Sequence, residues 1–140
     1  MRIGWLGLGA MGGPMAACLA RAGHQVHGFD IAAGRAAALA ADGVHAAASI
    51  RAAVADAELA AIMVATPDQL AAVLSGPDGV AAALPAGAIV AIMATVGPAA
   101  AEDAAARLAG RGIDVLDAPV SGGVTRAAAA ISILPRPLII

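Results

Sequence analysis

A glycine-rich loop near the amino terminus is the first group of residues whose spacing indicates chemistry. The loop follows the apolar run Ile3–Leu6, precedes an alanine-rich stretch, and has the G-x-G-x-x-G spacing. Its first glycine permits a tight turn, its second lets a phosphate approach the backbone, and its third lets a helix pack closely on a strand. The N–H groups and positive dipole end of that helix favour a pyrophosphate. A dinucleotide site is therefore predicted at Gly7, Leu8, Gly9, Ala10, Met11 and Gly12.

An acidic residue follows the loop at the distance expected for a ribose contact. Asp30 ends a second expected strand, eighteen residues after Gly12, close to the spacing of about 20 typical of dinucleotide-binding domains. A carboxylate there would accept hydrogen bonds from the ribose hydroxyls and repel a 2′-phosphate. We therefore expect NAD as the cofactor, with NADP as the alternative. Arg35 either receives a 2′-phosphate or lies on a solvated helix face, and Asp30 could instead be only a turn residue.

The rest of the chain supplies the elements that must position these residues. Short apolar runs alternate with alanine-rich stretches, which is typical of an α/β fold: a Rossmann-like, doubly wound, mainly parallel sheet with helices on both faces. The expected strands are Ile3–Leu6, Gln25–Phe29, Gly43–His45, Leu59–Val64, Ala88–Met93, Asp114–Asp117 and Ile131–Leu134. The expected helices are Met11–Ala22, Ala33–Ala41, Ser49–Asp56, Gln69–Leu74 and Pro98–Ala109.

Length and composition exclude several classes of protein. The 140 residues are expected to form one domain over residues 1–134, with an atypical or truncated tail over residues 135–140. A net charge of −2, with no basic cluster and only two aromatic residues, argues against nucleic-acid binding. The uncharged segment Gly79–Ala101 is interrupted by Pro85 and Gly87, so we expect no membrane span there. Without a secretion signal, the expected location is cytoplasmic.

The cysteine and the histidines give no functional signal. Cys18 lies in an alanine-rich stretch and is expected to be a small buried side chain. His24, His27 and His45 have no spacing that indicates catalysis, so structural roles are expected for all three. The sequence indicates no metal site.

Three segments, in order along the chain, resemble those of the β-hydroxyacid dehydrogenases, which include 3-hydroxyisobutyrate dehydrogenase and tartronate semialdehyde reductase. The glycine loop with Gly13-Pro14-Met15-Ala16 is similar to the cofactor signature of this family. Ala94-Thr95-Val96-Gly97-Pro98 is similar to its Ser-Thr-x-x-Pro segment. Asp117-Ala118-Pro119-Val120-Ser121-Gly122-Gly123 is similar to its substrate-loop signature.

The resemblance implies a site and a reaction. It implies cofactor contacts at Val64, Ala65 and Thr95, with Ala65 in place of the usual proline, and contacts to a substrate carboxylate at Ser121, Gly122 and Gly123. The implied reaction is hydride transfer between NAD and a small β-hydroxyacid. The family's helical carboxyl-terminal domain, which supplies dimer contacts, lies outside these 140 residues. We therefore also expect exposed apolar surface and self-association.

The chain departs from the family pattern in three places. All eight basic residues are arginine, so the lysine that transfers a proton in the family has no counterpart here and no catalytic residue is assigned. Arg126-Ala127-Ala128-Ala129-Ala130-Ile131 replaces a Gly-Ala-x-x-Gly-Thr-Leu segment, and Leu134-Pro135-Arg136-Pro137 replaces a strand and a Gly-Gly turn. We therefore expect a dinucleotide-binding domain that is inactive alone. The alternative is a non-catalytic binding or sensing module.

Overall fold

A central β-sheet with the strand order β3-β2-β1-β4-β5-β6-β7 organises the fold. The computed structural model describes residues 1–129, 138 and 139. Within this part β1 to β6 are parallel, and β7 pairs with β6 in the antiparallel direction. The strands are β1 (Arg2–Leu6), β2 (Gln25–Phe29), β3 (Val44–Ala46), β4 (Leu59–Ile62), β5 (Ile89–Ile92), β6 (Asp114–Asp117) and β7 (Leu138–Ile139).

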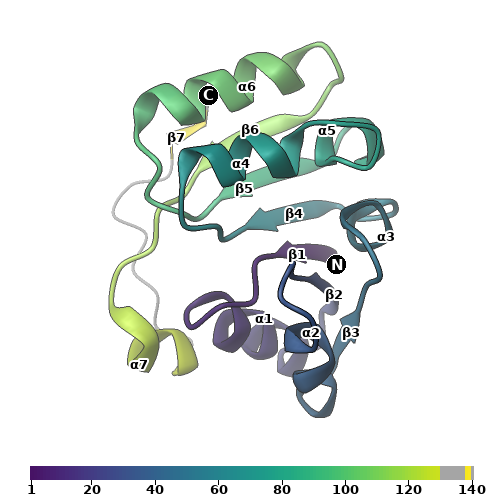
Figure 1. Cartoon of the computed structure of the whole chain (residues 1–140), viewed down its shortest axis with the longest axis vertical. Coiled ribbons are helices and arrows are strands. Elements are labelled where there is room, and N and C mark those ends of the chain that lie inside the picture. Colours follow the sequence, from purple (N-terminus) through teal and green to yellow (C-terminus); the bar gives the residue numbers. More distant parts are fainter. Residues whose placement is uncertain (130–137, 140) are drawn as a thin grey trace.

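Helices connect the parallel strands and cover both faces of the sheet. They are α1 (Gly12–Arg21), α2 (Arg35–Ala38), α3 (Ile50–Val54), α4 (Pro67–Leu74), α5 (Val80–Ala83), α6 (Pro98–Ala109) and α7 (Gly123–Ala128), with a 3-10 turn, η1, at Ala40–Asp42. In Figure 1, α1 and α7 lie on the opposite side of the sheet from α4, α5 and α6. This is the doubly wound arrangement predicted from the alternating pattern.

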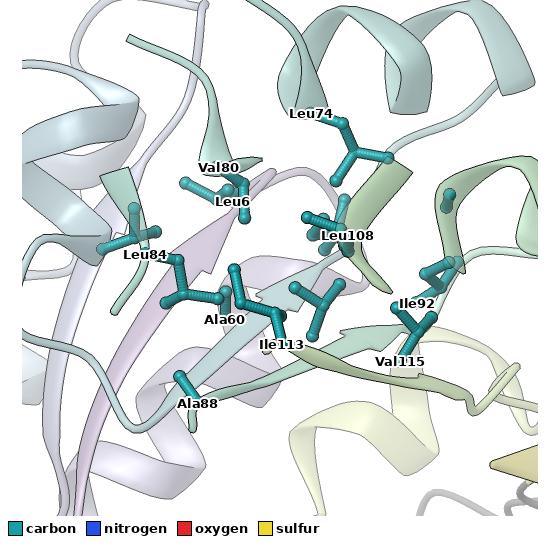
Figure 2. Close-up of a cluster of buried hydrophobic side chains, with 14 of the residues drawn as sticks. Leu6, Ala60, Leu74, Val80, Leu84, Ala88, Ile92, Leu108, Ile113 and Val115 are labelled. Carbon is teal, nitrogen blue, oxygen red and sulfur yellow. The ribbon is translucent and has the colours of Figure 1, made fainter. Parts of the chain in front are cut away.

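Two hydrophobic clusters, one on each face, hold the helices to the sheet. Alternation along β1 divides its side chains, because successive residues of a strand point to opposite faces. Ile3 and Trp5 join the cluster under α1, which includes Met15 and Ala16. Leu6 joins the larger cluster under α3, α4, α5 and α6. Figure 2 shows that larger cluster, in which buried aliphatic side chains from strands and helices meet.

Most of the expected elements are confirmed. Gln25–Phe29, Asp114–Asp117 and Pro98–Ala109 have the expected bounds. The elements β1, β3, β4, β5, α1, α3 and α4 agree with the expected ones to within a few residues at their ends. Gly23 lies two residues after the end of α1 and has a φ of +91°, in the left-handed region that suits glycine. The segment Gly79–Ala101 contains α5, β5 and the start of α6. No helix in the described part of the chain has the length and apolar character needed to cross a membrane.

Four features differ from expectation. The helix expected over Ala33–Ala41 is only the single turn α2 followed by η1, because Gly34 adopts a left-handed conformation with a φ of +86° and delays the helix start. The short helices α5 and α7 are not predicted, nor is β7, which pairs Leu138 and Ile139 with β6. The strand expected at Ile131–Leu134 lies outside the described residues. The domain boundary at residue 134 stays a prediction.

Candidate functional site

The glycine loop lies at the carboxyl end of β1, where the order of the sheet reverses. Strands added toward one edge are β2 and β3, and strands added toward the other are β4, β5 and β6. In open α/β sheets ligands bind in the crevice at such a switch point, outside the carboxyl ends of the strands. The fold therefore places the loop where this architecture forms binding sites.

The loop conformation requires glycine at its first and last positions. Gly7 has a φ of +97°, and a side chain there would place Cβ 2.2 Å from the carbonyl oxygen of Met63. A Cβ at Gly12 would lie 2.0 Å from the carbonyl oxygen of Gly7. A Cβ at Gly9 would approach only the guanidinium of Arg35, at 3.8 Å. The space beside Gly9 is therefore open to a ligand, whereas the space beside Gly7 and Gly12 is filled by protein.

Asp30 follows β2 directly, and its carboxylate faces the glycine loop. Its Oδ2 accepts a hydrogen bond of 2.7 Å from the backbone N–H of Leu8, and its Oδ1 accepts one of 2.8 Å from the backbone N–H of Ala32. Only 6% of the side chain is exposed. Each carboxylate oxygen has a second lone pair, and the half-exposed Arg35 is the group that approaches both oxygens on that side.

The electrostatics around Asp30 keep its carboxyl group ionised. Burial by itself would raise the pKa of Asp30, but the N–H groups of Ala32 and Leu8 and the guanidinium of Arg35 together lower it below its ordinary value. Nη1 of Arg35 lies 3.3 Å from Oδ2 and 3.4 Å from Oδ1 of Asp30. Arg35 is half-exposed. Its side chain therefore lies partly in solvent while it contacts Asp30.

Two adjoining cavities extend from the loop along the carboxyl edge of the sheet. One, of about 310 Å³, has Asp30, Ile31 and Arg35 in its lining. The other, of about 370 Å³, has Ala94, Thr95 and Val120 in its lining. Both cavities share the lining residues Gly9, Met63, Val64 and Ala65. Together they form a trough that crosses the switch point, with the glycine loop at its centre.

Most of the residues expected to contact a cofactor lie on this trough. Gly7 and Asp30 line the first cavity, Ala10, Met11, Gly12 and Thr95 line the second, and Gly9, Val64 and Ala65 line both. Leu8 is buried and lines neither cavity, but its N–H holds Asp30. Ser121, Gly122 and Gly123 are exposed and line neither cavity, although they directly follow Val120, which lines the second.

Gln69 is a lining residue that is not among those expected. Its Oε1 accepts a hydrogen bond of 2.8 Å from the backbone N–H of Ala65, and its own N–H donates to Oγ1 of Thr66, the N-cap of α4, at 3.2 Å. The Thr66-x-x-Gln69 spacing is close to that of a capping box, so this local structure could have been predicted from the sequence. The pair fixes the turn that carries Val64 and Ala65 beside the cavities.

The trough has the features that a dinucleotide requires. The open space at Gly9 admits a phosphate to the backbone, the ten-residue helix α1 begins at Gly12, and the ionised Asp30 lies at one end. A bound nicotinamide dinucleotide supplies the capacity to accept or donate a hydride. In the described part of the chain no group of three or more histidine, cysteine, aspartate or glutamate side chains could hold a metal ion.

Comparison with known families identifies the family of the chain. Residues 2–136 match the family described as the NAD binding domain of 6-phosphogluconate dehydrogenase. The chain belongs to this family. It is an NAD-binding domain, as the glycine loop predicts, and the resemblance to β-hydroxyacid dehydrogenases is confirmed by relatives of that group.

Three relatives illustrate the match. The chain is 36% identical over 129 residues to 2-(hydroxymethyl)glutarate dehydrogenase of Eubacterium barkeri, covering 92% of this chain and 43% of that protein. The structure of Mycobacterium tuberculosis 3-hydroxyisobutyrate dehydrogenase with L-serine has a TM-score of 0.84 and 42% identity, over 91% of this chain and 43% of that one. Psf3 in complex with NADP+ and 2-OPP has a TM-score of 0.87 and 30% identity, over 93% and 46%. The chain therefore spans less than half the length of these relatives.

Proposed function

We propose that the chain binds NAD in the trough at the carboxyl edge of the sheet. The pyrophosphate lies over Gly9 against the amino-terminal end of α1, and Asp30 accepts hydrogen bonds from the hydroxyls of the adenosine ribose. The nicotinamide half lies in the second cavity, beside Thr95 and Val120. The single observation that carries this proposal is that the two cavities meet at Gly9, between the acid on one side and the β4 and β5 ends on the other.

The proposal favours NAD over NADP because of the charge on Asp30. Its pKa is lowered, so at neutral pH the carboxylate is ionised and would repel a 2′-phosphate. Arg35 contacts this carboxylate and is half-exposed, so it is the group that would receive a 2′-phosphate, and NADP is proposed as the weaker ligand. Isothermal titration of the 140-residue chain with NADH and with NADPH tests both points. Tighter binding of NADH is expected, and failure to bind either nucleotide would overturn the proposal.

We further propose that the parent reaction is hydride transfer between NAD and a small β-hydroxyacid. In this reading Ser121, Gly122 and Gly123 contact the substrate carboxylate. The hydroxyl of Ser121 and the backbone N–H groups of the glycines suit an anion. All three residues are exposed and directly follow Val120, which lines the second cavity. Gly122 and Gly123 have φ values of +121° and +68°, so larger residues would be strained there.

The 140-residue chain alone is proposed to be catalytically inactive. It contains no lysine, and loss of a general acid/base commonly costs about 10²–10⁴ in rate. A dehydrogenase assay with 3-hydroxyacids and NAD should give negligible turnover from a preparation that binds NADH. Robust turnover would contradict the proposed inactivity while leaving the binding proposal intact.

A non-catalytic binding or sensing module is the second candidate function. The observation that favours it is that Ser121, Gly122 and Gly123 line neither of the two cavities. The substrate-loop signature at Ser121, Gly122 and Gly123 counts against it, because a sensor of dinucleotide alone has no need of a carboxylate site. The two candidates differ in one titration: a small β-hydroxyacid should bind the NADH complex in the first case and not in the second.

Self-association of the chain stays a prediction, as does a cytoplasmic location. The exposed large apolar side chains in the described part are Met1, Ile31, Ile89 and Val124. Val124 is on α7, next to the proposed substrate loop. Light scattering over a range of concentrations tests for association.

A further inference from the structure

The indole of Trp5 lies in the core and makes a polar contact with the glycine loop. Trp5 is 1% exposed and packs in the cluster under α1. Its Nε1–H donates a hydrogen bond of 3.0 Å to the carbonyl oxygen of Gly7, at the start of the glycine loop. A buried indole N–H requires an acceptor. Here that acceptor belongs to the segment proposed to hold the pyrophosphate.

The same peptide group is held from its other side. The carbonyl of Gly7 and the N–H of Leu8 belong to one planar trans peptide and therefore point in opposite directions. The carbonyl accepts from Trp5 at 3.0 Å, and the N–H donates to Oδ2 of Asp30 at 2.7 Å. We call these two hydrogen bonds the Gly7–Leu8 clamp. It fixes the rotation of a peptide whose glycine would otherwise adopt several conformations at little cost.

Gly12 closes the space around the clamp. A Cβ at Gly12 would lie 2.0 Å from the oxygen of Gly7 and 3.1 Å from Nε1 of Trp5. The Gly7 carbonyl therefore points into a narrow gap between the indole and the first turn of α1. The indole, the loop and the start of α1 therefore lie against one another. Removal of the Trp5 N–H acts directly on the Gly7 carbonyl, with no side chain between them.

We propose that Trp5 is a positioning residue for dinucleotide binding: its indole N–H orients the Gly7–Leu8 peptide so that the glycine loop and Asp30 are set for the ligand in advance. This inference rests on the proposed function for its binding consequence. Trp5→Phe keeps a large apolar ring in the core and removes the N–H. With no donor to the Gly7 carbonyl, the peptide is held on the Leu8 side alone, so its hydrogen bond to Asp30 should open more often.

The first test reads the clamp without any ligand. In the wild-type chain the amide of Leu8 should exchange slowly with solvent, and the single tryptophan should give one slowly exchanging indole N–H resonance. In Trp5→Phe the Leu8 amide should exchange at least several-fold faster. Ile3→Val is the matched control, because Ile3 is buried on the same strand and in the same cluster but makes no side-chain hydrogen bond. Unchanged protection of Leu8 in Trp5→Phe would overturn the clamp.

The second test reads binding by titration with NADH. Loss of one hydrogen bond is worth about 0.5–1.5 kcal/mol, so Trp5→Phe should bind NADH about two- to twelvefold more weakly than the wild type. Ile3→Val, which reduces core packing only, should bind within twofold of the wild type. Equal binding by Trp5→Phe and Ile3→Val would overturn the positioning role while leaving the proposed function intact. Absence of NADH binding by the wild-type chain would instead overturn the proposed function, and the binding role of Trp5 with it.

Discussion

The carboxylate of Asp30 accepts a hydrogen bond of 2.7 Å from the backbone N–H of Leu8, which lies twenty-two residues earlier in the chain. Parallel pairing of β1 with β2 brings the two residues together, since Leu6 pairs with Phe29 and the loop and the acid each follow directly. The acid proposed to recognise the ribose thus also holds the loop proposed to hold the pyrophosphate. Changes at Asp30 are therefore expected to affect both halves of adenosine diphosphate recognition.

Asp30→Asn should weaken NADH binding and reduce the preference for NADH over NADPH. The amide retains an oxygen for the Leu8 N–H but removes the charge that repels a 2′-phosphate and frees Arg35 to approach it. Hydrogen bonds to charged groups contribute about 1.5–3 kcal/mol, so an approximately ten- to hundredfold loss of NADH affinity is expected by isothermal titration. Asp78→Asn, an exposed acid that pairs with Arg51, is the matched control. An undiminished preference for NADH in Asp30→Asn would contradict the assigned role.

The fold is expected to lose stability in mild acid because of His27. Burial, Arg2 and His45 lower the pKa of His27 below its ordinary value of 6.5, while Asp56 opposes them. The two imidazole rings stack with centroids 5.1 Å apart. As the pH falls below about 6.5 the unfolded chain takes up this proton more readily than the folded chain, so the free energy of unfolding decreases.

Urea unfolding at pH values from 7.5 to about 5 measures this effect. His27→Gln should lose part of the decrease in stability below pH 6.5, because no proton is then taken up at that position on unfolding. His24→Gln, which alters a histidine outside the stacked pair, is the control. Equal pH profiles for the wild type and His27→Gln would show that His27 does not cause the decrease.

The elements that could be predicted are those with a repeated local signal. The strand Gln25–Phe29 and the proline-started helix Pro98–Ala109 have their expected bounds because each contains enough residues to display its pattern. The four-residue helix α5 has a single turn, which is too short to show a helical period. α7 begins at Gly123, and both Gly122 and Gly123 have a positive φ, which is typical of loop residues. Its start depends on backbone conformations that composition does not specify.

The candidate site also contains some residues that the sequence predicts and others that it does not. The loop and Asp30 could be predicted because their spacing reflects a βαβ unit of nearly constant size. The indole hydrogen bond of Trp5 could not, since a tryptophan in an apolar strand is most simply a core residue, and the acceptor of its N–H depends on how the turn after β1 folds back. The role of Arg35 does not follow from the sequence for a related reason. Only the approach of α2 to the end of β2 brings its guanidinium to Asp30.

Substitutions in the glycine loop should distinguish effects on folding from effects on NADH binding. Gly9→Ala should leave the fold intact, because a Cβ there meets only the Arg35 side chain at 3.8 Å and Gly9 does not need a positive φ. The free energy of unfolding should stay within about 0.5 kcal/mol of the wild type. The same methyl group would occupy the space proposed for the pyrophosphate, so NADH binding should fall below detection by titration.

Gly12→Ala should lower the stability of the fold, and its effect on NADH binding should follow from that change. Its Cβ would lie 2.0 Å from the backbone oxygen of Gly7, so either α1 or the loop must move. Overpacking of this kind typically costs about 1–3 kcal/mol, and urea unfolding should show a loss in that range, with NADH binding weakened as a consequence of the displaced loop. A variant Gly9→Ala that binds NADH normally would show that the ligand does not approach the backbone at Gly9. A variant Gly12→Ala as stable as the wild type would show that helix and loop are not packed as closely as this structure has them.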